Sequence, residues 1–406
     1  MITTKFHIGV SFGYFLLAAL LGVVLRMFVV VPIPVNYRFI VHTHSHIALL
    51  GWVYLALTTV LYHLFLSGQG VGIRYRRIFW FTQLSLVGML LSFPFQGYAL
   101  FSIVFSTLFL LASYWFAAFF IRNVPRSVKD THAYKCIRMA LWFMIGSSIG
   151  PWAMGPVMTI LGPESDWYRL VIYFYLHFLY NGWMVLALAG LFFYVLEQKG
   201  IRISKRTFNS FFLYTVGGII FSLFLSLLWT KPAGVLYIMG GLGALSQLIG
   251  FFILCKICSD NRSILRAGLS KPQYRILMSI ALLFTVKMVL QLFSAFPYFA
   301  DLAATVLDFT IGYLHWTFLG AITVGIFFFL DYLGLIRLRG IGFILYLIGF
   351  IITEALIFYR GMAVWQHWSL FDGYLDYLAM GSFLIPIALL LILWGSRGKG
   401  IRSNNF

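Results

Sequence analysis

Residues 37–66 read YRFIVHTHSHIALLGWVYLALTTVLYHLFL, a run long and apolar enough to cross a membrane as one helix. We predict this helix over residues 39–66. Three histidines, His42, His44 and His46, lie within its first two turns. Because a histidine inside lipid is costly and rare, we interpret the cluster as part of a functional site.

The whole chain has the composition of a membrane protein, since 62% of its 406 residues are hydrophobic and only 10% are charged. Runs of about 20 apolar residues recur along it, which predicts an all-α, polytopic fold surrounded by a lipid bilayer. No polar stretch is long enough for a soluble domain, so we expect residues 1–406 to form a single integral membrane domain. We predict twelve transmembrane helices, over residues 8–31, 39–66, 77–95, 98–121, 137–161, 170–197, 207–229, 234–257, 273–295, 308–332, 338–358 and 374–395.

The distribution of Lys and Arg predicts the orientation of these helices. The formal net charge of +18 does not indicate a nucleic-acid partner, because the basic residues are concentrated in alternate loops. Both termini belong to the basic set, through Lys5, Arg397, Lys399 and Arg402. The opposite loops hold only Arg38, Arg169, Lys231 and Arg360. The positive-inside rule therefore places both termini in the cytoplasm, and we expect a multi-pass protein of a bacterial inner membrane.

Two further histidines fall at the same expected depth as the cluster. His177 and His315 each follow the start of a helix that enters from the outer side, and all three positions are expected about 10 Å below the outer boundary. Imidazoles from facing helices can clamp a heme iron or bind another metal ion. Within the cluster, a turn of 100° per residue places His42 and His46 on one face and His44 on the opposite face. We find no convincing sequence repeat.

Other charged residues are also predicted to lie within or close to the membrane. Lys287 lies inside the helix over 273–295, with Gln291 on the same face, and it either contributes to a proton route, binds a heme carboxylate or extends to the outer interface. Arg26 is a similar case. Arg38, Lys231 and Arg360 lie on the outer side, where they either bind carboxylates of a heme or are ordinary loop residues.

Three short motifs resemble subunit I of the heme-copper oxidase superfamily, in particular its cbb-type members, and the related NnrS family. Residues 309–315 read FTIGYLH and resemble the cbb-type W-T-I-G-H-V-H. Residues 44–51 read HSHIALLG and resemble an NnrS-like H-x-H-x-x-x-x-G, while His42-Thr43 resembles the cbb-type start of that helix. His177, followed by Gly190 and Tyr194, resembles the helix that offers one copper ligand.

The resemblance implies a twelve-helix bundle that holds a low-spin heme b. His315 matches one axial ligand, and either His42 or His44 matches the other. His46 and His177 are candidates for copper or another metal ion. The ligand set is incomplete, because Tyr313 stands where the ligand of the oxygen-reducing heme belongs, and no histidine pair occurs in residues 207–229. A cytochrome or a quinol is the electron donor that the resemblance implies.

These features lead to one leading hypothesis and two alternatives. The leading hypothesis is a b-type heme protein in nitric oxide handling or respiratory electron transfer. The first alternative is an active, divergent nitric oxide or oxygen reductase, which requires an open heme site. The second is a transporter of heme or of another small molecule. Neither the substrate nor the oligomeric state follows from the sequence.

Overall fold

The computed structural model describes residues 4–338 and 340–397, and this part of the chain is built from helices without strands. Arg339, Lys399 and Arg402 lie outside the described residues. The chain divides into two compact units, of which unit 1 combines Met1–Pro125 with Ile326–Phe406 and unit 2 is Arg126–Gly325. The single domain over residues 1–406 stays a prediction.

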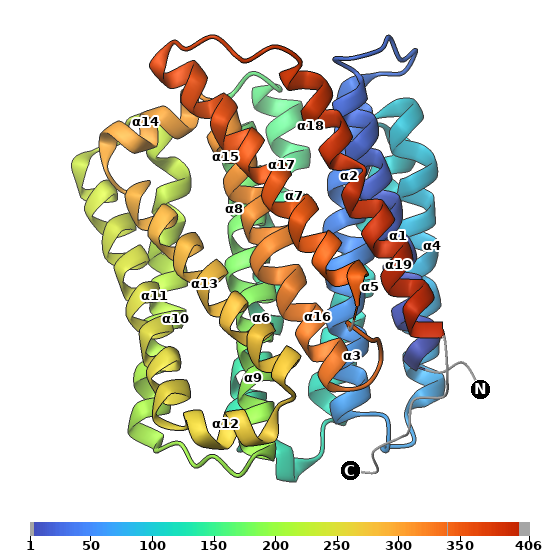
Figure 1. Cartoon of the computed structure of the whole chain (residues 1–406), viewed down its shortest axis with the longest axis vertical. Helices are drawn as coiled ribbons and strands as arrows, with labels where there is room; N and C mark the ends of the chain where they lie inside the picture. The colour runs from blue at the N-terminus through green and yellow to red at the C-terminus, as the bar shows by residue number, and fades with distance from the viewer. Residues whose placement is uncertain (1–3, 339, 398–406) are drawn as a thin grey trace. The chain divides into compact units, whose positions relative to one another are not determined.

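Unit 1 is formed by both ends of the chain, and its long helices run side by side in alternating directions (Figure 1). Short connections join successive helices, which is typical of antiparallel neighbours in a membrane bundle. Its elements are α1 (Thr4–Met27), α2 (Tyr37–His46), η1 (Ile47–Tyr54), α3 (Leu55–Phe65), α4 (Gly72–Gln96), α5 (Leu100–Asn123), most of α16 (Thr323–Tyr332), α17 (Ile341–Gln366), α18 (Tyr374–Ser382) and α19 (Leu384–Arg397).

Unit 2 comes from the middle of the chain and contains the candidate histidines His177 and His315. Its elements are η2 (Arg126–Val128), α6 (His132–Ser147), α7 (Ile149–Pro156), η3 (Val157–Leu161), α8 (Asp166–His177), η4 (Phe178–Val185), α9 (Leu186–Gln198), α10 (Lys205–Ser222), η5 (Leu223–Thr230), α11 (Gly234–Asp260), α12 (Arg262–Gly268), α13 (Lys271–Phe293), α14 (Pro297–Thr305), α15 (Leu307–His315) and η6 (Trp316–Ile322).

Eleven helices within the described residues are long and apolar enough to span a membrane, whereas twelve were predicted. The difference lies in the segment predicted over 137–161, which is helical but divided. α6 ends at Ser147, and a new helix, α7, begins at Ile149. Pro151 and Pro156 follow in α7 and in its last position, and proline cannot donate the backbone hydrogen bond that a continuous helix requires.

The three spans that carry the candidate ligand histidines are the most buried of these helices. The buried share is 83% for Tyr37–Phe65, 78% for Asp166–Gln198 and 67% for Leu307–Tyr332, against 28–50% for the other spans. Polar side chains on such helices face protein rather than lipid, which is the arrangement expected of a functional site in a membrane.

Each of these three spans changes from α-helix to π-helix directly after a histidine. The π-helical segments are η1, η4 and η6, and the residues that precede them are His46, His177 and His315. A glycine follows each histidine by five positions, at Gly51, Gly182 and Gly320. This H-x-x-x-x-G pattern is a short internal repeat that the sequence analysis missed. Segments of π-helix inside α-helices occur frequently at functional sites.

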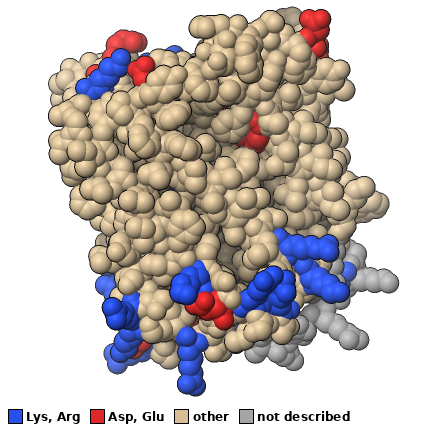
Figure 2. Space-filling view, turned by 60° about the vertical axis from the view of Figure 1, so that its left-hand side comes forward, with Lys and Arg blue, Asp and Glu red and all other residues tan. Residues whose placement is uncertain are grey.

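Lys and Arg side chains gather at one end of the helices on the face that Figure 2 shows, beyond a broad band with few charges. In unit 2 this is the end at which α10 and α13 begin and α11 ends, with Lys205, Arg206, Lys256 and Lys271. The band is what a lipid-facing surface requires.

Candidate functional site

His44 is held against α1 in unit 1. Its Nδ1 lies 2.9 Å from the carbonyl oxygen of Ala18, and its ring lies beside Gly22. Since a carbonyl oxygen only accepts, Nδ1 carries the proton and donates it, and the lone pair of the ring lies on Nε2. A backbone carbonyl on the distal ring nitrogen is the usual way in which a metal-binding histidine is oriented.

His42 and His46 lie on the other face of α2, as the helical spacing predicts. Both rings pack against Phe93 and Tyr98. The Nδ1–H of His46 donates to the carbonyl oxygen of His42 at 2.8 Å, and the Tyr98 hydroxyl donates to its Nε2 at 3.2 Å. Both nitrogens of His46 are therefore hydrogen-bonded within unit 1.

Gly51 of η1 lies directly against α1. A Cβ at this position would lie 2.8 Å from the Tyr14 side chain, so a tyrosine of α1 fills the volume beside the glycine. The close approach of α1 to η1 at Gly51 fixes the position of the helix that carries His44.

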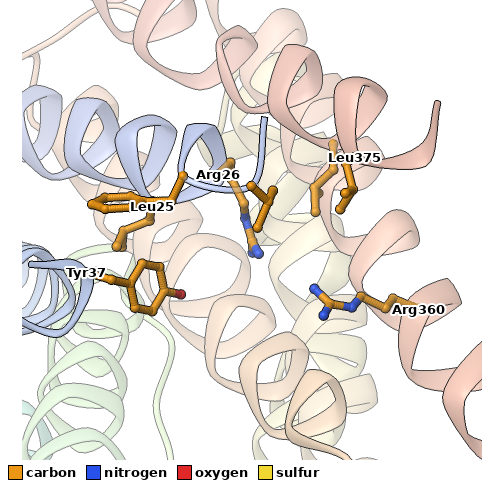
Figure 3. A pocket seen from close by; sticks show the side chains of 8 residues that line it. Leu25, Arg26, Tyr37, Arg360 and Leu375 are labelled. Atoms are coloured by element: carbon orange, nitrogen blue, oxygen red, sulfur yellow. The ribbon is translucent and has the colours of Figure 1, made fainter. Parts of the chain in front are cut away.

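A pocket of about 370 Å³ lies in unit 1 at the end where α1 finishes and α2 begins (Figure 3). The guanidinium groups of Arg26 and Arg360 point toward one another into it, and the Tyr37 hydroxyl faces the same space. The remaining walls are apolar, formed by Leu25, Phe28, Val29, Leu375 and Leu378. Two guanidinium groups in an apolar pocket favour a ligand that carries negative charge, because such groups bind carboxylates and phosphates in a bidentate manner.

This pocket lies on one side of His44 along α1 and α2, toward the end of α1 and the start of α2. Arg26 follows Gly22 by one turn of α1, and Tyr37 precedes His44 by two turns of α2, so each pair shares a helix face. At 1.5 Å per residue these separations are roughly 6 Å and 10 Å. A ligand bound to His44 and extending along these helices toward the pocket would therefore approach Arg26 and Tyr37.

Arg38 and Lys231, which were also predicted to lie on the outer side, do not line this pocket. Arg38 is exposed and does not line the pocket, whereas Arg26, which the sequence analysis noted only as a membrane cation, does. Lys231 in unit 2 forms an ion pair with Asp301 at 3.4 Å, with both side chains exposed. Of the predicted anion-binding residues, only Arg360 faces the pocket.

His177 is buried in unit 2, and both of its ring nitrogens are hydrogen-bonded. Its Nε2 donates to the carbonyl oxygen of Ile219 at 2.8 Å, and its Nδ1 accepts from the Asn181 amide at 3.4 Å. Binding of a metal to His177 would displace one of these partners.

Lys287 is fully buried in unit 2, so the interpretation that it extends to the outer interface is wrong. Its Nζ donates to Asn181 Oδ1 and to Gln291 Oε1, both at 2.5 Å. The Tyr313 hydroxyl donates to the same Gln291 oxygen at 3.3 Å. The side chains of α13, α15 and the η4 segment are thus joined in one buried polar cluster, and Tyr313 belongs to it.

His315 ends α15 and is half-buried in unit 2. Within the described residues, no three His, Cys, Asp or Glu side chains come together in a way that could hold a metal ion. Of the predicted ligands, His42, His44 and His46 belong to unit 1, and His177 and His315 belong to unit 2.

Sequence analysis missed Asn181 and Tyr98, which decide how the neighbouring histidines are hydrogen-bonded. Neither residue has a sequence signal of its own, apart from the position of Asn181 one turn after His177.

No protein-family model matches this chain, and no curated protein matches its sequence.

Proposed function

We propose that the chain is a b-type heme protein of the heme-copper oxidase and NnrS type, which acts in nitric oxide handling or respiratory electron transfer. The observation that carries the proposal is the orientation of His44. Its Nδ1–H donates to the Ala18 carbonyl, so the lone pair that an iron atom requires lies on Nε2. Of the two ligands left open by the sequence, this geometry favours His44 over His42.

The Arg26 and Arg360 pocket supports the same proposal. A b-type heme carries two carboxylates at one edge and is otherwise apolar, which matches two guanidinium groups at one end of apolar walls. Arg26, Arg360 and Tyr37 would hold the carboxylates, and His44 would hold the iron. A heme bound between two imidazoles supplies one-electron transfer. The second imidazole is predicted from the sequence to be His315, and this pairing stays a prediction.

A second metal at His46 or His177 receives no support from the geometry. Each of these histidines already uses both ring nitrogens in hydrogen bonds to neighbouring groups. We therefore propose heme without copper as the leading case. The topology proposed with it has both termini in the cytoplasm of a bacterial inner membrane and a bundle like that of heme-copper oxidase subunit I.

The proposal is tested by optical spectra of the purified, dithionite-reduced protein. We expect the bands of a six-coordinate b-type heme in the wild type and their loss in His44→Ala and His315→Ala. His46→Ala is the matched control, since His46 lies two residues away and its nitrogens are occupied, and it should retain the heme. Loss of heme in His46→Ala with retention in His44→Ala would refute the assignment.

Carbon monoxide separates the proposal from the reductase alternative. A six-coordinate heme with two imidazoles has no open position, so we expect the reduced spectrum to stay unchanged under the gas. A shifted spectrum would favour a heme with an open site.

A further inference from the structure

The Lys287 cluster surrounds a fully buried amine with neutral groups. Besides the oxygens of Asn181 and Gln291, its Nζ has the Met288 sulfur at 3.9 Å and the Tyr180 ring at 5.7 Å. Within the described residues the structure gives Lys287 no carboxylate partner. A buried cation without a counter-charge is strongly unfavourable, so buried charges in proteins are normally paired.

The Gln291 amide adds a second observation that points to a ligand. Two donors, Lys287 Nζ and the Tyr313 hydroxyl, converge on its Oε1, which fixes the orientation of the amide. The Nε2 group then points away from both donors. It has no hydrogen-bond partner, although Gln291 is only 6% exposed. A buried donor without an acceptor requires an explanation, and an ion or a water molecule is the usual one.

We propose that Lys287 and Gln291 form a binding site for a small monovalent inorganic anion, of the size of chloride, bromide or nitrite. Such an anion only accepts hydrogen bonds, which suits a cluster that offers an amine and an unpartnered amide N–H but lacks a carboxylate. It accepts from Gln291 Nε2, and its charge offsets that of the Lys287 amine on the other side of the amide group. This site lies in unit 2 and does not rest on the heme proposal.

The test is the thermal stability of the purified full-length protein in sodium gluconate, titrated with chloride, bromide or nitrite at constant ionic strength. A ligand that binds only the folded state raises the unfolding temperature in proportion to its occupancy. We expect a saturable rise for the small anions in the wild type. Equilibrium binding of radiolabelled chloride gives the affinity directly.

Three variants identify the site. Lys287→Met should abolish the anion response. Gln291→Leu leaves the amine in place and removes the amide donor, and we expect at least a tenfold lower anion affinity, in line with a hydrogen bond to a charged group. Gln291→Glu places a carboxylate beside Lys287, so this variant should be stable in gluconate alone and insensitive to anions.

Gln83 on α4 provides the matched control. It has the same exposure of 6%, and its Nε2 also lacks a hydrogen-bond partner, but it belongs to unit 1 and lies outside the Lys287 cluster. Gln83→Leu should therefore keep the full anion response, which also controls for anions bound by surface Lys and Arg.

Three results would overturn the proposal. The first is an unfolding temperature in the wild type that does not depend on the small anions. That result would mean that Gln291 Nε2 donates to a water molecule and that the Lys287 amine is neutral. The second is an anion response that survives in Gln291→Glu. The third is an equal loss of the response in Gln83→Leu and Gln291→Leu. Because Gln291→Glu keeps a polar side chain of similar size, the test remains decisive if Lys287→Met does not fold.

Discussion

Neighbouring histidines on α2 are distinguished by the acceptors that their rings meet. His44 donates from Nδ1 to a carbonyl of α1, whereas His46 donates to its own helix and accepts from Tyr98. The first arrangement assigns the ring proton of His44 to Nδ1, and the second uses both ring nitrogens of His46. Residue type alone does not separate the two, because the hydrogen bond on one ring nitrogen decides what the other can do.

Gly22 is predicted to be necessary for the orientation of His44. A Cβ at this position would lie 3.2 Å from the His44 ring, so Gly22→Val should push the imidazole off the Ala18 carbonyl. We expect about a 10–100-fold loss of heme affinity, the usual effect of disturbing a ligand's supporting hydrogen bond. Heme titration of the apoprotein measures it.

Gly13→Val is the control for this change. Gly13 lies on the same helix, and nothing lies within 4 Å of the Cβ that a side chain would add. Equal losses of heme affinity in the two variants would show that Gly22 acts through α1 itself and not through His44.

At the scale of elements, glycine allows the helices of this bundle to pack closely. α10 and α11 meet at Gly218 and Gly243, and a Cβ on Gly243 would lie 2.2 Å from the backbone nitrogen of Ser222. Small residues at such contacts allow helix backbones to approach, which is the main source of packing free energy between membrane helices.

Gly243→Ala should therefore destabilise unit 2. The obstacle is backbone and cannot rotate away, so we expect a loss of about 1–3 kcal/mol in the free energy of unfolding, as for overpacked cores. Gly217→Ala on α10 meets nothing within 4 Å and should be neutral or slightly stabilising. Thermal unfolding in detergent compares the two, and a Gly243→Ala protein as stable as Gly217→Ala would contradict the close contact.

The π-helical segments change which side of a helix its residues face. Three of the four π-helical segments in the described residues, η1, η4 and η6, begin one residue after a histidine, whereas η3 follows Pro156. The glycine five positions after the histidine lies against an aromatic side chain in two of these three cases, Tyr14 at Gly51 and Phe143 at Gly182. A π-helical turn shifts the helix face by part of a turn, so the residues before and after it face different neighbours. Helix faces derived from a constant 100° per residue therefore do not extend across these segments.

At the scale of the whole molecule, the orientation in the membrane stays a prediction from the charges. Arg126 and Glu164 are both exposed, and they lie at opposite ends of the segment formed by α6, α7 and η3. We expect a cysteine at Glu164 to react with a membrane-impermeant maleimide in intact cells and a cysteine at Arg126 to react only after lysis.

The background for this measurement lacks the native thiols, Cys136, Cys255 and Cys258. Labelling of both introduced cysteines in intact cells would mean that the divided α6–α7 segment does not cross the bilayer. Labelling of Arg126→Cys alone would reverse the predicted orientation.

The sequence by itself determined that the chain is a bundle of membrane helices and placed three histidines early in three of them. These properties depend on the transfer free energy of each segment and on the charges beside it, which are local quantities. Only the tertiary structure decided which ring nitrogen of each histidine carries the proton, which arginines line the pocket and which groups surround Lys287. The Lys287 and Asn181 side chains meet across 106 positions of the chain, and no periodicity or spacing reports a contact of that kind.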